Sequence, residues 1–112
     1  MIPSTVQGQT VGTGAPINIV LGYFPDYVKV VNRVTGAELT WMRTAGVAGG
    51  SVQISTAGAR TVVTGAANSI ATYSAATGAV TGDGFTIPIN AAVNIATNAL
   101  DYFCSRSGPG SI

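Results

Sequence analysis

Hydrophobic and polar residues alternate along much of this chain with a period of two, which is typical of β-strands. The pattern is clear at Ile17, Ile19 and Leu21, where Asn18 and Val20 intervene. Glycine, proline, asparagine and aspartate interrupt it at intervals of roughly 8–12 residues, the spacing of short strands joined by turns. Strands are therefore expected at residues 17–21, 27–34, 38–43, 51–56, 60–64, 69–73, 85–89 and 100–106.

The segment from Tyr27 to Arg43 predicts a β-hairpin. One face of its first strand is expected to carry Val28, Val30, Asn32 and Val34. Gly36 lies in the turn, where a two-residue connection favours a residue that accepts positive φ. Across this hairpin, Arg33 and Glu38 could form an ion pair, and Asp101 could pair with a neighbour.

Other segments lack a clear period. Residues 1–14 are polar and rich in glycine, so we expect an extended N-terminal arm, and residues 107–112 form a C-terminal tail. Residues 74–84 are expected to be a loop, and residues 91–100 fit either one or two helical turns or extended chain. Pro88 cannot donate to a ladder, so its strand is expected at a sheet edge or a bulge.

Together these segments predict a single all-β domain at residues 15–106. Seven to nine short strands with turns between them indicate an antiparallel β-sandwich or barrel, and we take the sandwich as the expected fold. The single cysteine, Cys104, cannot form an internal disulfide. Its alternation with Leu100 and Tyr102 places it on an apolar strand face, as a small buried hydrophobic residue.

Composition argues against an enzyme. Only 8% of the 112 residues are charged and there is no histidine, so acid–base and nucleophilic chemistry have few groups to use. The four carboxylates (Asp26, Glu38, Asp83 and Asp101) are scattered, and the glycine-rich runs match no phosphate-binding loop. We expect no catalytic residues, cofactor, metal or small-molecule substrate. A net charge of +1 argues against a nucleic-acid partner, and no apolar run of the roughly 18 residues needed to span a membrane is present.

The mean hydropathy of +0.41 is high for a chain with so few charges, and it favours burial of apolar surface by other chains. We therefore expect a homo-oligomer or another obligate assembly. Tyr23 and Phe24 at a turn are candidate contact residues. The arginines Arg33, Arg43, Arg60 and Arg106 either pair with acids of this chain or meet carboxylates on a partner.

The order of several segments resembles a known family. The segments are residues 12–19 (GTGAPINI), residues 21–32 (LGYFPDYVKVVN), a tryptophan in the next strand, residues 84–87 (GFTI), and an aromatic last strand that ends at Arg106. This pattern looks like the small virion proteins of tailed bacteriophages that decorate or cement the capsid. The resemblance covers residues 12–43 and 84–106. Residues 88–90 (PIN) depart from the polar Gly-Thr-Asp stretch that the family often has there.

The resemblance implies a β-sandwich, often jelly-roll-like, that binds between capsomers in many copies. It implies the major capsid protein and other copies of the chain, as a dimer or trimer, as partners. It also implies a place on the outer surface of the capsid, after synthesis in the host cytoplasm. The alternative is a receptor- or carbohydrate-binding module of a phage head fibre, spike or tail, in which Tyr23 and Phe24 would stack on sugars.

Overall fold

The computed structural model describes residues 5–45, 49–74 and 83–106. Over these residues the chain is all-β, with nine strands paired in antiparallel fashion and one turn of 3-10 helix, η1 (Arg43–Ala45). The strands are β1 (Thr5–Val11), β2 (Ile17–Val20), β3 (Tyr27–Asn32), β4 (Glu38–Met42), β5 (Ser51–Ile54), β6 (Arg60–Val63), β7 (Ala71–Ser74), β8 (Asp83–Ile87) and β9 (Ala99–Ser105). The all-β prediction is confirmed, and each expected strand overlaps an observed one.

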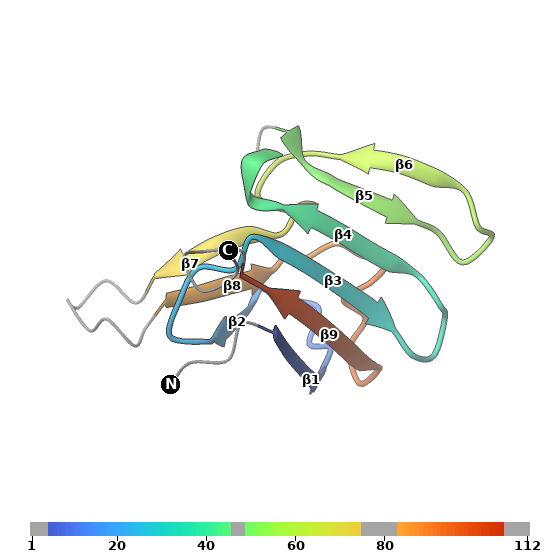
Figure 1. Cartoon of the computed structure of the whole chain (residues 1–112). Helices are drawn as coiled ribbons and strands as arrows, with labels where there is room; N and C mark the ends of the chain where they lie inside the picture. The colour runs from blue at the N-terminus through green and yellow to red at the C-terminus, as the bar shows by residue number, and fades with distance from the viewer. Residues whose placement is uncertain (1–4, 46–48, 75–82, 107–112) are drawn as a thin grey trace.

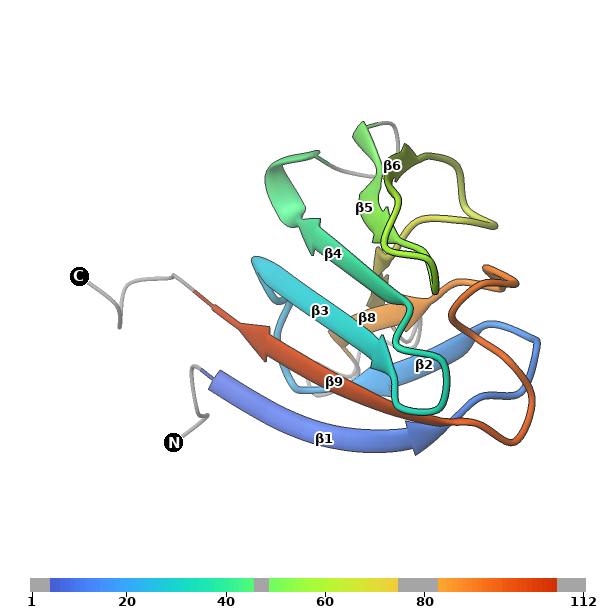
Figure 2. The ribbon, with the colours of Figure 1, turned by 90° about the vertical axis from the view of Figure 1, so that its right-hand side faces the viewer.

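The strands form two sheets. The six-stranded sheet has the order β1-β9-β3-β4-β5-β6, and the three-stranded sheet has the order β2-β8-β7. Figures 1 and 2 show the small sheet lying across one face of the large one, which gives a sandwich-like arrangement of two layers. β3 to β6 follow one another as neighbours, whereas β1 and β9, from opposite ends of the chain, pair side by side.

The core lies between the two sheets. Alternate residues of the central strands point inward, so β3 supplies Val28 and Val30 and β4 supplies Leu39 and Trp41. The small sheet covers them with Phe85 and Ile87, and β9 adds Leu100 and Cys104. The prediction that Cys104 is a buried hydrophobic residue is confirmed.

Residues 5–11, within the segment expected to be an extended arm, form β1 and pair along their whole length with β9. Gly8 lies opposite Tyr102 in this pairing. A Cβ at position 8 would collide with the Tyr102 ring, which packs edge-on against Phe85 at 5.7 Å between ring centroids. The glycine in an otherwise aperiodic segment therefore makes room for an aromatic ring that packs against the core.

Residues 91–98 contain turns and no α-helix, and the buried Asn94 and Asn32 side chains connect them to distant parts of the chain. The Asn94 side chain accepts hydrogen bonds from the backbone N–H groups of Thr13 and Gly14 and donates to the carbonyl oxygens of Ala15 and Pro88. Asn32 donates to the Val93 carbonyl oxygen at 2.9 Å. Asparagine can satisfy several backbone groups at once, so these side chains replace a sheet ladder where the chain is irregular.

Two details differ from the sequence prediction. β3 ends at Asn32, so Val34 is not on its inward face but in the following turn, 68% exposed. β8 ends at Ile87, just before Pro88, and β8 is the central strand of its sheet, not an edge or a bulge. The positive φ expected at Gly36 is confirmed, at 82°. Most of the loop expected at 74–84 lies outside the described residues.

Candidate interaction surfaces

The outer face of the six-stranded sheet is not covered by any described strand, so its side chains are available for contacts. Residues that alternate with the core residues form this face, because successive side chains of a strand point to opposite sides. Cross-strand partners share a face, which links Glu38 to Ile54 and Thr40 to Val52. The outer face divides into two regions of different chemistry, one over β1, β9 and β3 and the other over β4, β5 and β6.

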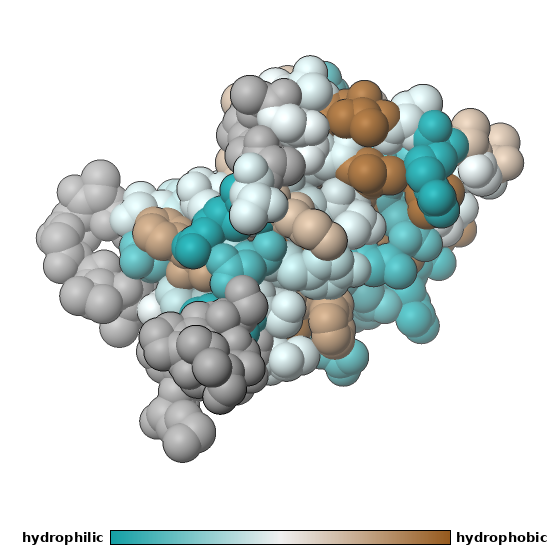
Figure 3. Space-filling model, turned by 45° about the horizontal axis from the view of Figure 1, so that its top comes forward, coloured by the Kyte–Doolittle hydropathy of each residue, from teal (hydrophilic) through white to brown (hydrophobic). Residues whose placement is uncertain are grey.

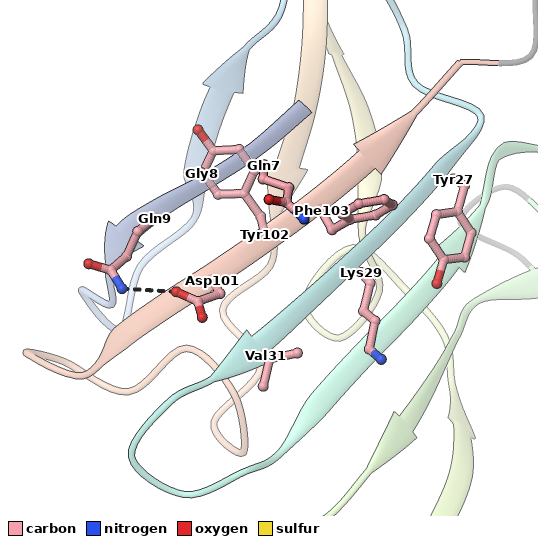
Figure 4. Close-up of a pocket in the computed structure, with 9 residues that line it drawn as sticks. All are labelled: Gln7, Gly8, Gln9, Tyr27, Lys29, Val31, Asp101, Tyr102 and Phe103. Carbon is pink, nitrogen blue, oxygen red and sulfur yellow. Dashed lines mark hydrogen bonds between the residues drawn. The ribbon is translucent and has the colours of Figure 1, made fainter. Parts of the chain in front are cut away.

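Over β1, β9 and β3 the surface is hollowed into an open groove of about 820 Å³. Glutamines of β1, an acid and an aromatic ring of β9, and three side chains of β3 line it (Figure 4): Gln7, Gln9, Asp101, Phe103, Tyr27, Lys29 and Val31. The Gln9 amide donates to Asp101 Oδ1 at 2.9 Å. The rings of Tyr27 and Phe103 meet edge to face, with centroids 6.4 Å apart. The groove therefore presents both aromatic and hydrogen-bonding surface.

Over β4, β5 and β6 the outer face carries a group of apolar side chains beside Glu38, Thr40 and Arg60. We define the β4–β6 patch as Met42, Val52, Ile54 and Val62, which the register of the three strands places on one face. Met42 is 56% and Val62 is 64% exposed. A smaller hollow of about 310 Å³ lies between Met42, Val52 and Val62. Figure 3 shows strongly hydrophobic surface at the β5–β6 end of the molecule.

Two of the predicted contact arginines form ion pairs within the chain. Arg33 pairs with Asp101 and Arg43 pairs with Asp26, each at 3.0 Å between nitrogen and oxygen. The expected Arg33–Glu38 pair is wrong, because Glu38 pairs with Lys29 at 3.3 Å. Arg33 lies beyond the end of β3, where Asp101 on β9 is the nearer acid. Exposed pairs of this kind stabilise a fold by about 0–1 kcal/mol, and they leave these arginines partly neutralised.

Arg60 and Arg106 have different surroundings. Arg60 is exposed at the start of β6 and forms no ion pair with any described residue. Arg106 lies over the ring of Tyr23, with its guanidinium carbon 4.5 Å from the ring centroid. Among the four arginines predicted to contact a partner, Arg60 and Arg106 are thus the two that the described residues leave without an acid.

Tyr23 is only 5% exposed, so its ring offers little surface to a partner, whereas Phe24 is half-buried. The Tyr23 hydroxyl is buried without a hydrogen-bond partner among the described residues. Burial raises the pKa of Tyr23, the nearby Cys104 raises it further, and Arg106 lowers it. Burial also raises the pKa of the Cys104 thiol to about 11, so this thiol stays protonated and unreactive at neutral pH.

The described residues contain no group of three metal-ligating side chains and no helix long and apolar enough to cross a membrane. Sequence reasoning did not single out the β4–β6 patch or the groove. The alternation in residues 38–42 and 51–54 could have indicated the patch residues of β4 and β5, because it also shows which side chains face away from the core. β6 gave no such signal, since Val62 and Val63 are both apolar.

Comparison of the chain with family models, curated proteins and solved structures finds no match. The two outer-face regions are therefore the features of the chain that bear on its function.

Proposed function

We propose that this chain is a virion structural protein that decorates the capsid of a tailed bacteriophage and cements contacts between capsomers. The observation that carries the proposal is the β4–β6 patch, in which Met42 and Val62 are exposed and Val52 and Ile54 are half-buried on the outer face of the sheet. Exposed apolar patches commonly mark protein contacts. The major capsid protein is the partner that we propose for this patch, on the outer surface of the capsid.

The scarcity of charge is consistent with this role. Lys29, Arg33 and Arg43 already have acids of the same chain beside them, so a partner meets a surface of low net charge. Burial of apolar area contributes about 25 cal/mol per Å² before the costs of association are subtracted. A modest net gain for each copy, repeated over a particle, would resist the pressure of packaged DNA. The jelly-roll relationship, the N-terminal arm and self-association are parts of the same proposal.

The test is heat stability of phage particles. Particles that lack the protein are expected to release DNA at a lower temperature than decorated ones, and added wild-type protein should restore the difference. Val62→Asp should fail to restore it, because it places a charge within the patch. Val20→Asp is the matched control, since Val20 is 56% exposed but lies on β2 in the other sheet. Equal release temperatures for bare and decorated particles would contradict the cementing role.

The groove favours a second candidate, a carbohydrate-binding module of a head fibre, spike or tail. Aromatic rings such as Tyr27 and Phe103 can stack on the apolar faces of sugars, and the paired Gln9 and Asp101 side chains can bind hydroxyls. A glycan array probed with the wild-type protein tests this candidate. Binding that is lost in Tyr27→Ala and kept in Tyr73→Ala, on the other sheet, would favour it. An array without any bound glycan would exclude it for the sugars tested.

A further inference from the structure

β6 is the last strand of the six-stranded sheet and has a partner, β5, on one side only among the described residues (Figure 1). An edge strand presents unpaired N–H and C=O groups, which can pair with another chain. All four residues of β6 are exposed or half-buried. The strand therefore combines open backbone groups with the exposed apolar side chain of Val62.

The hydrogen-bonding pattern identifies which backbone groups of β6 are open. The Ser55 N–H donates to the Ala59 carbonyl oxygen at 2.9 Å where the β5–β6 hairpin closes. Directly opposed residues of an antiparallel pair alternate between bonded and non-bonded pairs. With the observed register, Thr61 and Val63 therefore bond to β5. The N–H and C=O groups of Arg60 and Val62 point away from β5, toward the open edge.

We propose that β6 pairs in antiparallel fashion with β6 of a second copy of this chain, with Val62 opposite Val62 of the copy. This inference deepens the proposed function, since it assigns the self-association that the function includes to one edge. In this register the outward-facing backbone groups of both strands meet one another. Side chains opposite one another also share a face, as they must in a continuous sheet.

The side chains favour the same partner. The Val62 register brings the two β4–β6 patches together as one apolar surface across the two-fold axis, which a symmetric dimer makes self-complementary. Arg60 then stands opposite Thr64 of the copy and not opposite its own counterpart, so like charges are not directly opposed. The other edge of the sheet, β1, is a poorer choice because glutamines Gln7 and Gln9 line it.

The test is the oligomeric state of the full chain, measured by sedimentation equilibrium over a range of concentrations. Val62→Pro removes an N–H that bonds to nothing within the sheet, so the intrachain ladder stays intact. We expect wild-type protein to dimerise and Val62→Pro to raise the dimer dissociation constant at least tenfold. Gln9→Pro is the matched control on the other edge of the sheet. The Gly12 N–H donates to the Asn98 carbonyl oxygen, so by alternation along β1 the Gln9 N–H points away from β9, toward the open edge. The Gln9→Pro variant should therefore dimerise as wild type does.

A crosslink tests the register independently, should Val62→Pro fail to fold. In a Cys104→Ser background, Val62→Cys is expected to form a disulfide-linked dimer on oxidation, and Arg60→Cys is not, because its counterpart is four residues out of register. Wild-type protein that stays monomeric, a Val62→Pro variant that dimerises like wild type, or an Arg60→Cys crosslink equal to that of Val62→Cys would each overturn the proposal. Because these measurements use free protein, they are separate from the particle-heating test.

Discussion

The centre of the six-stranded sheet and its β5–β6 hairpin are built from similar residues but have opposite surroundings. β3 and β4 alternate strictly between buried and half-exposed positions, and Trp41 is only 2% exposed. In β6, by contrast, no residue is fully buried. The centre has a strand on each side and a second sheet across one face, whereas β6 has one neighbour and an open edge. The difference places stability at the centre and available surface at the hairpin.

The largest expected effect is the loss of the largest core side chain. Trp41→Ala should lower the free energy of unfolding by about 3–5 kcal/mol, because it removes buried apolar contacts and leaves a cavity between the sheets. Val62→Ala in the hairpin should change it by no more than about 0.5 kcal/mol. Urea titrations followed by circular dichroism measure both values. Equal losses for the two variants would mean that the hairpin is as much part of the stable core as β4 is.

The next effect concerns the asparagine that joins the start of the chain to the turns before β9. Asn94→Ala should lower the free energy of unfolding by about 2–3 kcal/mol, because it removes four hydrogen bonds of the buried Asn94 side chain, including the one to the buried Pro88 carbonyl oxygen. Asn68→Ala is the control, since Asn68 is exposed and makes one weaker bond of 3.3 Å to the Thr64 carbonyl oxygen. A loss in Asn94→Ala as small as that in the control would show that water replaces the side chain.

The next effect is expected from the buried thiol of Cys104, on β9. Its pKa is raised by burial from 9.0 to about 11, so the unfolded chain loses this proton at lower pH than the folded chain does. The thiol therefore contributes stability that is fully present below pH 9 and is lost as the pH rises toward 11. The slope reaches about 1.4 kcal/mol per pH unit for one such proton. Denaturant titrations of wild type and Cys104→Ala across this range should diverge, and parallel curves would rule this contribution out.

The smallest effect is local opening, which hydrogen exchange measures residue by residue. The Val62 amide points to the open edge and should exchange almost without protection in dilute monomer, whereas the Val30 amide, between β3 and β4, should be strongly protected. At concentrations where the proposed dimer forms, the Val62 amide should become protected and the Gln9 amide should not. Strong protection of Val62 in dilute monomer would contradict the open-edge description of β6.

Alternation predicted the strands well where one face is buried. In β3 and β4 the inward residues were readable because apolar and polar positions differ, and the Gly36 turn followed from local backbone requirements. Alternation wrongly placed Val34 on the inward face of β3, because nothing in the local pattern marks the end of strand pairing at Asn32. β1 was not predicted as a strand because residues 5–11 show no clear alternation. The reason for Gly8 is the Tyr102 ring, which leaves no room for a Cβ at this position and lies 94 positions away in the sequence.

The contact residues were predicted less well. Arginines were identifiable as scarce cations, but their partners depend on which strands are neighbours, so Arg33 lies beside Asp101 and not beside Glu38. The sequence predicted Tyr23 as an exposed residue at a turn, whereas in the structure its ring is buried beneath Arg106. The two outer-face regions combine side chains from three strands each, a grouping that exists only after the sheet order is known.

The sequence by itself determined that this chain is a β protein with a single core, because the period of hydrophobic residues is a local property that fixes which face of each strand avoids water. It also determined how little charge is available for chemistry. Only the tertiary structure decided the sheet order, the pairing of the two ends of the chain, and the open β6 edge. Those depend on contacts between residues far apart in sequence, where many pairings satisfy the same local pattern and only joint packing selects one.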